Sequence, residues 1–111
     1  MTTDAIVVMI TARDQAEAQK ISRHLLTERL AACVNMIPGV TSLFWWEGRI
    51  DESREVLLLV KSRRPLMSRI VAAARSQHSY EVPEILALPI EAGHDDYLNW
   101  IKANVKDDDL S

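Results

Sequence analysis

Residues 31–61 read AACVNMIPGVTSLFWWEGRIDESREVLLLVK and predict a long β-hairpin, because apolar and β-prone residues fill both arms. The polar run at residues 51–54, Asp-Glu-Ser-Arg, separates the two arms, so we expect the turn there. Glu47-Gly48 is the rival turn, but it would divide the hairpin unevenly. We therefore interpret Gly48 as a bulge or kink in the first arm.

The first arm of this hairpin is unusually long. Extended from Val40 to Ile50, it would span ~35 Å, whereas a usual strand has about 5–6 residues. Such a ribbon extends past any sheet that a domain of this size can build. We expect another copy of the same chain to cover its far end.

The flanking sequence predicts strands and helices in alternation. An unbroken apolar run in the first strand is typical of the centre of a sheet, and Asp14 with Glu17 forms a capping box before the first helix. Pro38-Gly39 and Pro89 indicate edge strands or a bulge, since proline donates no hydrogen bond. The elements expected around the first arm are strand Ala5–Thr11, helix Gln15–Arg29, strand Glu55–Lys61, a helix from Pro65 to His78, a loop over Tyr80–Pro83, strand Ile85–Ile90, and a helix from Asp95 or Asp96 to Val105.

This order, βαββαβ with an extra C-terminal helix, predicts the α+β class and a ferredoxin-like antiparallel sheet with strand order 4-1-3-2. We expect one domain over residues 1–106 and a disordered acidic tail over residues 107–111. The helices of such a sheet lie on one side, yet both interior strands are apolar throughout instead of alternating. Copies of the chain in a closed ring are the expected cover for the other face.

Composition limits the partners of the chain. With 111 residues, a net charge of -3 and scattered Lys and Arg residues, it is not expected to bind nucleic acid. The single cysteine, Cys33, excludes an intramolecular disulfide and fits a reducing compartment. The apolar run Ile6–Ile10 is too short for a signal peptide or a membrane span. We therefore expect a cytoplasmic protein without membrane partners.

Several blocks of the sequence also carry a family resemblance. They are residues 28–35 (ERLAACVN), 38–42 (PGVTS), 46–50 (WEGRI), 55–61 (EVLLLVK), 78–84 (HSYEVPE), 87–90 (ALPI) and 97–101 (YLNWI). In order and spacing the chain resembles the CutA divalent-cation tolerance family. The resemblance implies a ferredoxin-like homotrimer locked by long hairpins, similar in build to the PII signalling proteins. It also implies binding and tolerance of divalent metals, copper especially.

The chain departs from the family pattern at three positions. Ser79 stands where the family usually has proline, Phe44 where it usually has tyrosine, and Arg49 where it usually has lysine. The serine is expected to loosen the loop after His78.

Cys33 and His78 are the candidate metal ligands, and the resemblance points to both positions. A thiolate together with an imidazole favours copper or zinc over magnesium or calcium. Alternatively, Cys33 is a small core residue and His78 a helix C-cap, because no CxxC or HxxH spacing supports a site. His94 and His24 are surface residues or weak ligands in this interpretation.

A second constellation consists of Trp46, Glu47, Lys61, Tyr80 and Glu84, which are expected to line a cleft between subunits. Aromatic walls and a few charges suit a small ligand there. The alternative is that the aromatic residues are interface packing and the charges form ion pairs across it. No catalytic motif accompanies either arrangement, so we expect neither an enzyme nor an organic cofactor.

These patterns leave three hypotheses for function. The first is a cytoplasmic trimer that binds divalent cations, copper in particular, and contributes to metal tolerance. The second is a PII-like sensor that binds an anionic metabolite at the cleft between subunits. The third is a trimeric scaffold that anchors partner proteins.

Overall fold

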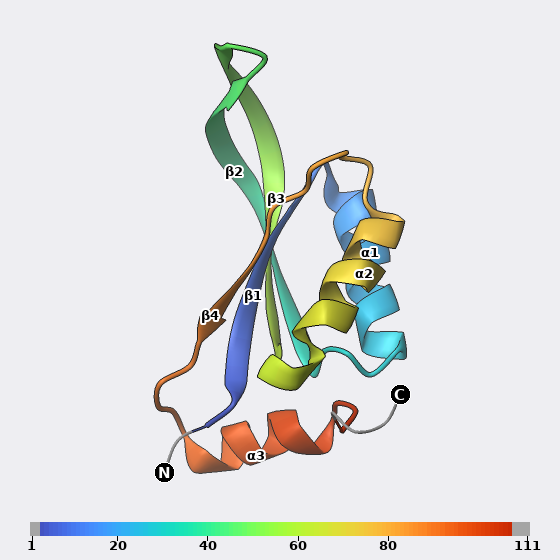
Figure 1. Ribbon diagram of the computed structural model, residues 1–111, viewed down its shortest axis with the longest axis vertical. Helices are drawn as coiled ribbons and strands as arrows, with labels where there is room; N and C mark the ends of the chain where they lie inside the picture. Colours follow the sequence, from blue (N-terminus) through green and yellow to red (C-terminus); the bar gives the residue numbers. More distant parts are fainter. Residues whose placement is uncertain (1–2, 108–111) are drawn as a thin grey trace.

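The computed structural model describes residues 3–107 and contains the predicted order of elements (Figure 1). In chain order these are β1 (Ala5–Ala12), α1 (Gln15–Thr27), β2 (Cys33–Trp46), β3 (Arg49–Arg63), a 3-10 turn η1 (Arg64–Leu66), α2 (Met67–Gln77), β4 (Ile85–Pro89) and α3 (Asp95–Ala103). The α+β class and the extra C-terminal helix are therefore confirmed. Residues 108–111 of the predicted tail lie outside the described residues.

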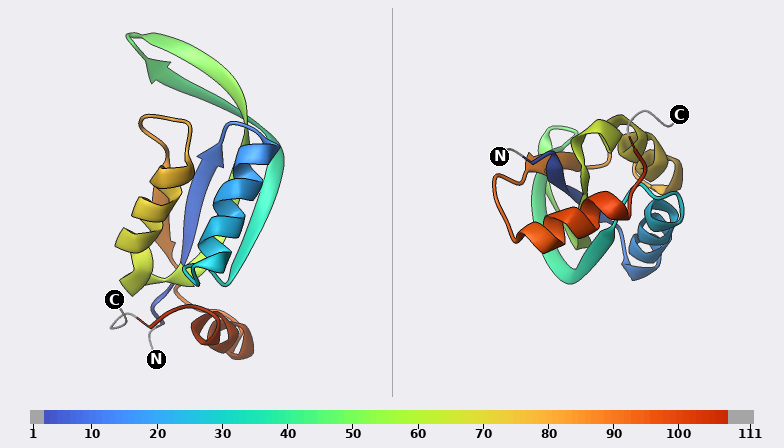
Figure 2. Two further views of the ribbon diagram at one scale, coloured as in Figure 1. Left: turned by 90° about the vertical axis from the view of Figure 1, so that its right-hand side faces the viewer. Right: turned by 90° about the horizontal axis from the view of Figure 1, so that it is seen from below.

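The sheet has the predicted topology. Its strand order is β2-β3-β1-β4, and each neighbouring pair is antiparallel. Helices α1 and α2 pack side by side on one face, whereas α3 lies across one end of the sheet (Figure 2). The predicted helices extend one or two residues too far: α1 ends at Thr27, α2 at Gln77 and α3 at Ala103, and β4 ends at Pro89.

The predicted hairpin turn is wrong. The chain turns at Glu47-Gly48, where Trp46 pairs with Arg49, and residues 51–54 continue strand β3 opposite residues 41–44. Glu47 and Gly48 have φ values of 49° and 77°, the left-handed conformation that a two-residue hairpin turn requires at both positions. Gly48 is thus the turn residue and not a bulge. The polar run at residues 51–54 led to a wrong turn prediction because exposed strand residues are also polar.

The irregularity predicted at Pro38-Gly39 is confirmed. The register between β2 and β3 shifts between Ile37 and Val40, so residues 38 and 39 have no partner in the ladder. Gly39 has a φ of 75°, which a residue with a Cβ rarely adopts. Pro38 thus lies outside the ladder, where its missing N–H costs no hydrogen bond between the strands.

The core lies between the sheet and the helices α1 and α2. Alternate residues of β1 and β3 point into it, and the register places Ile10 opposite Leu58 and Val8 opposite Val60, all fully buried. Helix α1 contributes Ile21 and Leu25, and α2 contributes Ile70. This cluster holds the strands and helices in one body.

The opposite face of the sheet is apolar but only partly covered. Its rows combine Val7 and Met9 of β1, Leu57 and Leu59 of β3, and Leu86 and Leu88 of β4. Leu86 and Leu88 are 58% and 52% exposed, and the other four are half-buried. The interior strands are therefore buried on the helix side alone within one chain. We call this surface the open face.

No helix within residues 3–107 combines the length and the apolar character needed to cross a membrane.

Substitution of Gly48 by alanine tests the corrected turn. A Cβ at Gly48 meets nothing within 4 Å, so the cost comes from the positive φ alone, and we expect a loss of about 1 kcal/mol of stability. Gly93→Ala is the matched control, because a Cβ there makes only ordinary contacts with Leu98 at 3.6–3.7 Å. Denaturant unfolding of both variants at one protein concentration gives the two values. Equal stabilities of the variants would contradict the assignment of the turn.

Candidate functional site

The five predicted cleft residues are not brought together within one chain. Trp46 and Glu47 lie at the tip of the hairpin, where Trp46 pairs with Arg49. Lys61 lies twelve residues further along β3, a distance of about 40 Å along the strand. Tyr80 and Glu84 belong to a third place, the connection between α2 and β4. A cleft that includes all five therefore needs more than one copy of the chain.

Tyr80 is anchored to the sheet by a buried carboxylate. Its hydroxyl donates a hydrogen bond of 2.7 Å to Oε2 of Glu55, a residue of β3 that is 7% exposed. Burial of the phenol, reinforced by the adjacent Glu55 carboxylate, raises the pKa of Tyr80 to about 12. Tyr80 therefore acts as a hydrogen-bond donor at neutral pH and not as an ionised phenolate.

His78 has both ring nitrogens in use. Its imidazole is fully buried; Nε2 donates to the carbonyl oxygen of Thr11 at 2.7 Å, and Nδ1 accepts from the backbone N–H of Tyr80 at 3.1 Å. These bonds define the neutral tautomer with the proton on Nε2. The ring also packs against Tyr80, with centroids 4.8 Å apart. To bind a metal ion, His78 must give up one of these bonds.

Glu17 is the partner that connects this region to α1. One carboxylate oxygen accepts from the backbone N–H of Arg13 at 2.7 Å, and the other accepts from the N–H of Ser79 at 2.5 Å. Burial disfavours ionisation of Glu17, but the bonds from Ser79 and Arg13 outweigh it and hold the pKa below its usual value. The sequence indicated Glu17 only as part of the capping box, which Asp14 completes by accepting from the Glu17 N–H at 2.9 Å.

Cys33 lies at the other end of the sheet, where β2 begins. It is half-buried and pairs with Lys61, whose ammonium group donates to Sγ at 3.8 Å and also to the side-chain oxygen of Asn35. Tyr97 of α3 is the third neighbour. Burial together with the nearby Cys33 thiol raises the pKa of the Tyr97 phenol. The thiol is thus surrounded by an ammonium group, an amide and a phenol.

The two predicted metal ligands do not share a coordination sphere within one chain. The row of Cys33 and Lys61 continues to Val7 of β1, whereas His78 contacts Thr11, four residues further along the same strand. That spacing corresponds to about 13 Å. Residues 3–107 contain no group of three or more His, Cys, Asp and Glu side chains able to hold a metal ion. His94 accepts from the N–H of Asp96 and caps α3.

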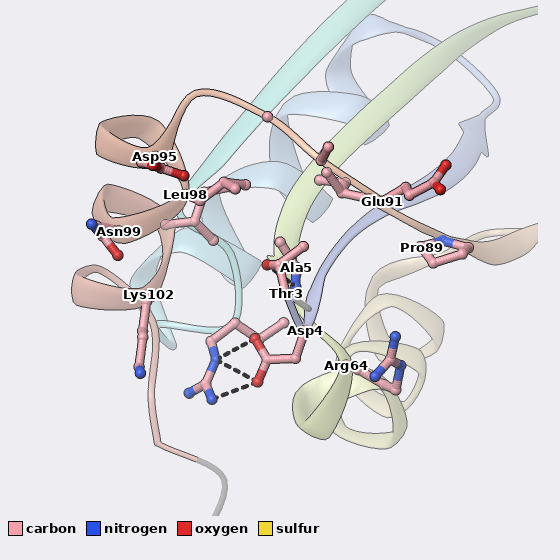
Figure 3. Close-up of a pocket in the computed structure, with 15 residues that line it drawn as sticks. Thr3, Asp4, Ala5, Arg64, Pro89, Glu91, Asp95, Leu98, Asn99 and Lys102 are labelled. Atoms are coloured by element: carbon pink, nitrogen blue, oxygen red, sulfur yellow. Dashed lines mark hydrogen bonds and ion pairs between the residues drawn. The ribbon is translucent and has the colours of Figure 1, made fainter. Parts of the chain in front are cut away.

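A groove lies beside α3, where the start of β1 meets the end of β3 (Figure 3). The carboxylate of Asp4 accepts three hydrogen bonds from Arg63, at 2.7, 3.1 and 3.2 Å. These bonds from the guanidinium hold the pKa of Asp4 below its usual value. Arg64 and Lys102 line the same groove together with Glu91 and Asp95, so its charges balance. No sequence pattern indicated this groove, because it joins residues distant in the chain.

The chain is similar to proteins of one family along most of its length. A family model described as CutA1 divalent ion tolerance protein matches residues 6–104. A divalent-cation tolerance protein CutA of Pectobacterium atrosepticum is 42% identical over 103 residues, covering 93% of this chain and 94% of the relative. The chloroplastic protein CutA 1 of Oryza sativa subsp. japonica is 37% identical over 106 residues, which are 96% of this chain and 60% of that longer protein.

Solved structures with CutA1 names are also similar to this chain in fold. The crystal structure of CutA1 from Oryza sativa superposes with a TM-score of 0.91 at 37% identity, covering 95% of this chain and 96% of that chain. The divalent cation tolerance protein (Cut A1) from Thermus thermophilus gives a TM-score of 0.90 at 42% identity, with 92% of this chain and 99% of that chain covered.

Titration of Tyr80 tests its bond to Glu55. In a Tyr97→Phe background Tyr80 is the one remaining tyrosine, so ultraviolet absorbance follows its phenol alone. We expect a pKa of about 12, which Glu55→Gln lowers because the negative charge that retains the proton is gone. A folded pKa above the unfolded value of about 10 means that this stabilisation is complete below pH 10 and is lost as the pH rises towards 12. An unchanged midpoint in Glu55→Gln would show that the carboxylate does not act on Tyr80.

Proposed function

This chain belongs to the CutA1 divalent ion tolerance protein family, and from that membership we propose that it is a cytoplasmic homotrimer that binds divalent cations, copper foremost. The match over residues 6–104 is the observation that carries the proposal. The family is named for tolerance of cations and not for a reaction, which supports a binding protein and not an enzyme.

The first support for a ring of copies is the hairpin tip. Neighbouring residues of a strand point to opposite faces, so Leu43 and Trp45 lie on one face, with Ile50 opposite Trp45, while Phe44 and Trp46 lie on the other. All five are exposed, Trp45 to 73%. A ribbon that is apolar on both faces needs cover on both sides. A ring gives each subunit two neighbours, whereas a two-fold dimer gives it one.

The second support is the open face with its unpaired sheet edges. Leu86 and Leu88 of β4 and the half-buried residues of β1 and β3 form a continuous apolar surface. Strands β2 and β4 are the edges of the sheet, and copies of the chain are able to pair with them. Assembly into a ring removes both the apolar exposure and the free edges.

Cys33 is the predicted metal ligand that the fold leaves accessible. A thiolate is a soft ligand that suits copper, and Cys33 is only partly buried at the rim of the open face. His78 is buried and fully hydrogen-bonded in the same chain. We therefore propose that Cys33 begins the coordination of copper and that side chains of a neighbouring subunit complete it, with His78 contributing only if it exchanges an internal bond for the metal.

A PII-like sensor is the second candidate, and the placement of Lys61 favours it. Lys61 carries its ammonium group on the open face, far from Trp46 and Glu47 of its own chain. In a ring, the hairpin tip of a neighbour is long enough to reach such a position. The resulting cleft would offer a cation and aromatic walls to an anionic metabolite.

Replacement of Leu88 by lysine tests the assembly. The side chain is half-exposed in a single chain, so the subunit tolerates the charge, but an interface over the open face does not. We expect sedimentation at micromolar concentration to give trimers for the parent protein and mostly monomers for Leu88→Lys. Ala16→Lys on the exposed side of α1 is the control for added charge and keeps the trimer. A folded monomeric parent protein would overturn the ring.

Calorimetric titration with copper and zinc tests the cation function. We expect stoichiometric copper uptake that weakens as the pH falls, because the thiol must lose its proton, and that Cys33→Ala strongly reduces. His24→Ala on α1 is the control for a histidine outside the site. Unchanged uptake in the combined variant Cys33→Ala/His78→Ala would refute the metal site. A metabolite that raises the melting temperature with and without chelator, but not in Lys61→Ala, would instead support the sensor.

A further inference from the structure

The connection of residues 78–84 crosses the end of the sheet between α2 and β4. In Figure 1 it passes the end of β1 and the start of α1 before it reaches β4. It has no helix or strand of its own, so the ladder bonds of the sheet do not hold it. Tyr80 and Glu84, two of the predicted cleft residues, both lie in it.

Three elements fasten this connection, and each of the three bonds uses a buried side chain. The N–H of Ser79 donates to Glu17 of α1, the His78 ring donates to Thr11 of β1, and the Tyr80 hydroxyl donates to Glu55 of β3. Nδ1 of His78 lies 3.8 Å from the same Glu17 oxygen that accepts from Ser79. Glu17 is therefore next to both the first and the second residue of the connection.

We propose that Glu17 is a positioning residue that fixes the 78–84 connection to the start of α1 and thereby holds Tyr80 in place at the subunit cleft. The cleft in this statement rests on the proposed function. The fixing of the connection does not, because all of its bonds lie within one chain.

A carboxylate is required at this position because it must accept from two donors. The N–H groups of Arg13 and Ser79 belong to segments that are 66 residues apart, and each takes one of the two oxygens. An amide in place of the carboxylate would present an NH₂ group to one of these donors. The Glu17 side chain is 5% exposed, so water does not replace the lost bond.

Local capping alone does not explain the arrangement. The N–H of Glu17 is already bonded to Asp14, and the Arg13 bond uses only one carboxylate oxygen. The second oxygen serves a residue that follows α2. A glutamate that only caps the start of α1 does not need a hydrogen bond from Ser79.

The test compares Glu17→Gln with Glu28→Gln, a control that removes one charge from the exposed end of the same helix. We expect Glu17→Gln to accelerate hydrogen exchange of the Ser79 and Tyr80 amides about tenfold or more, while core amides of β1 and β3 stay protected. Unchanged exchange of the Ser79 and Tyr80 amides in Glu17→Gln would overturn the proposal.

A second variant keeps the test decisive if Glu17→Gln does not fold. Ser79→Pro deletes the donor and leaves Glu17 intact, and the preceding residue, His78, already has the extended backbone (φ −95°, ψ 140°) that a following proline favours. We expect faster exchange of the Tyr80 amide in this variant, because residue 79 no longer donates to Glu17. Unchanged exchange of the Tyr80 amide in Ser79→Pro would overturn the proposal.

These measurements use the protein without metal or metabolite. Their failure would therefore disprove the positioning role and leave the proposed function standing. Failure of copper or metabolite binding would instead disprove the proposed function and leave the positioning role of Glu17 standing.

Discussion

A four-stranded sheet with two apolar faces and helices on one of them is the constraint on which the rest of the structure depends. The face towards α1 and α2 is closed by residues such as Ile10, Leu58 and Ile70. The other face ends in half-exposed leucines on β4, and α3 reaches only one end of it. Because burial of apolar surface is the main source of stability, covering this face would stabilise the chain, and this is the basis of the proposed ring.

The same constraint distributes the functional residues over separate places. Cys33 and Lys61 lie at one end of the open face, Tyr80 and Glu84 lie near the other, and Trp46 and Glu47 lie beyond the sheet at the hairpin tip. Each group is held by its own set of bonds, such as Tyr80 to Glu55 and Lys61 to Asn35. One chain fixes the geometry of each part of the proposed site. Several chains are needed to bring these parts together.

Much of the fold could be predicted because local chemistry specifies it. Pro38-Gly39 indicated the bulge in β2, Pro89 indicated the edge strand, and the apolar runs of β1 and β3 indicated the central pair. The turn was missed because Asp51 to Arg54 resembles a turn in composition, whereas in the structure these residues are paired strand and the positive φ values of the turn lie at Glu47 and Gly48. Glu17 was recognised as a capping residue but not as a partner of Ser79, since no local pattern encodes a bond across 62 residues.

The outer part of the hairpin has a consequence for how the protein matures. Strand β1 pairs with residues 56–63 of β3, so residues 49–55 have β2 as their single neighbour in the sheet. A two-stranded ribbon alone in water is only marginally stable. In the proposed ring, a newly made subunit therefore carries an unsupported arm with two exposed tryptophans until it meets others. Its maturation then follows the rate of encounter between chains, and scarcity of subunits leaves the arm available to chaperones and to aggregation.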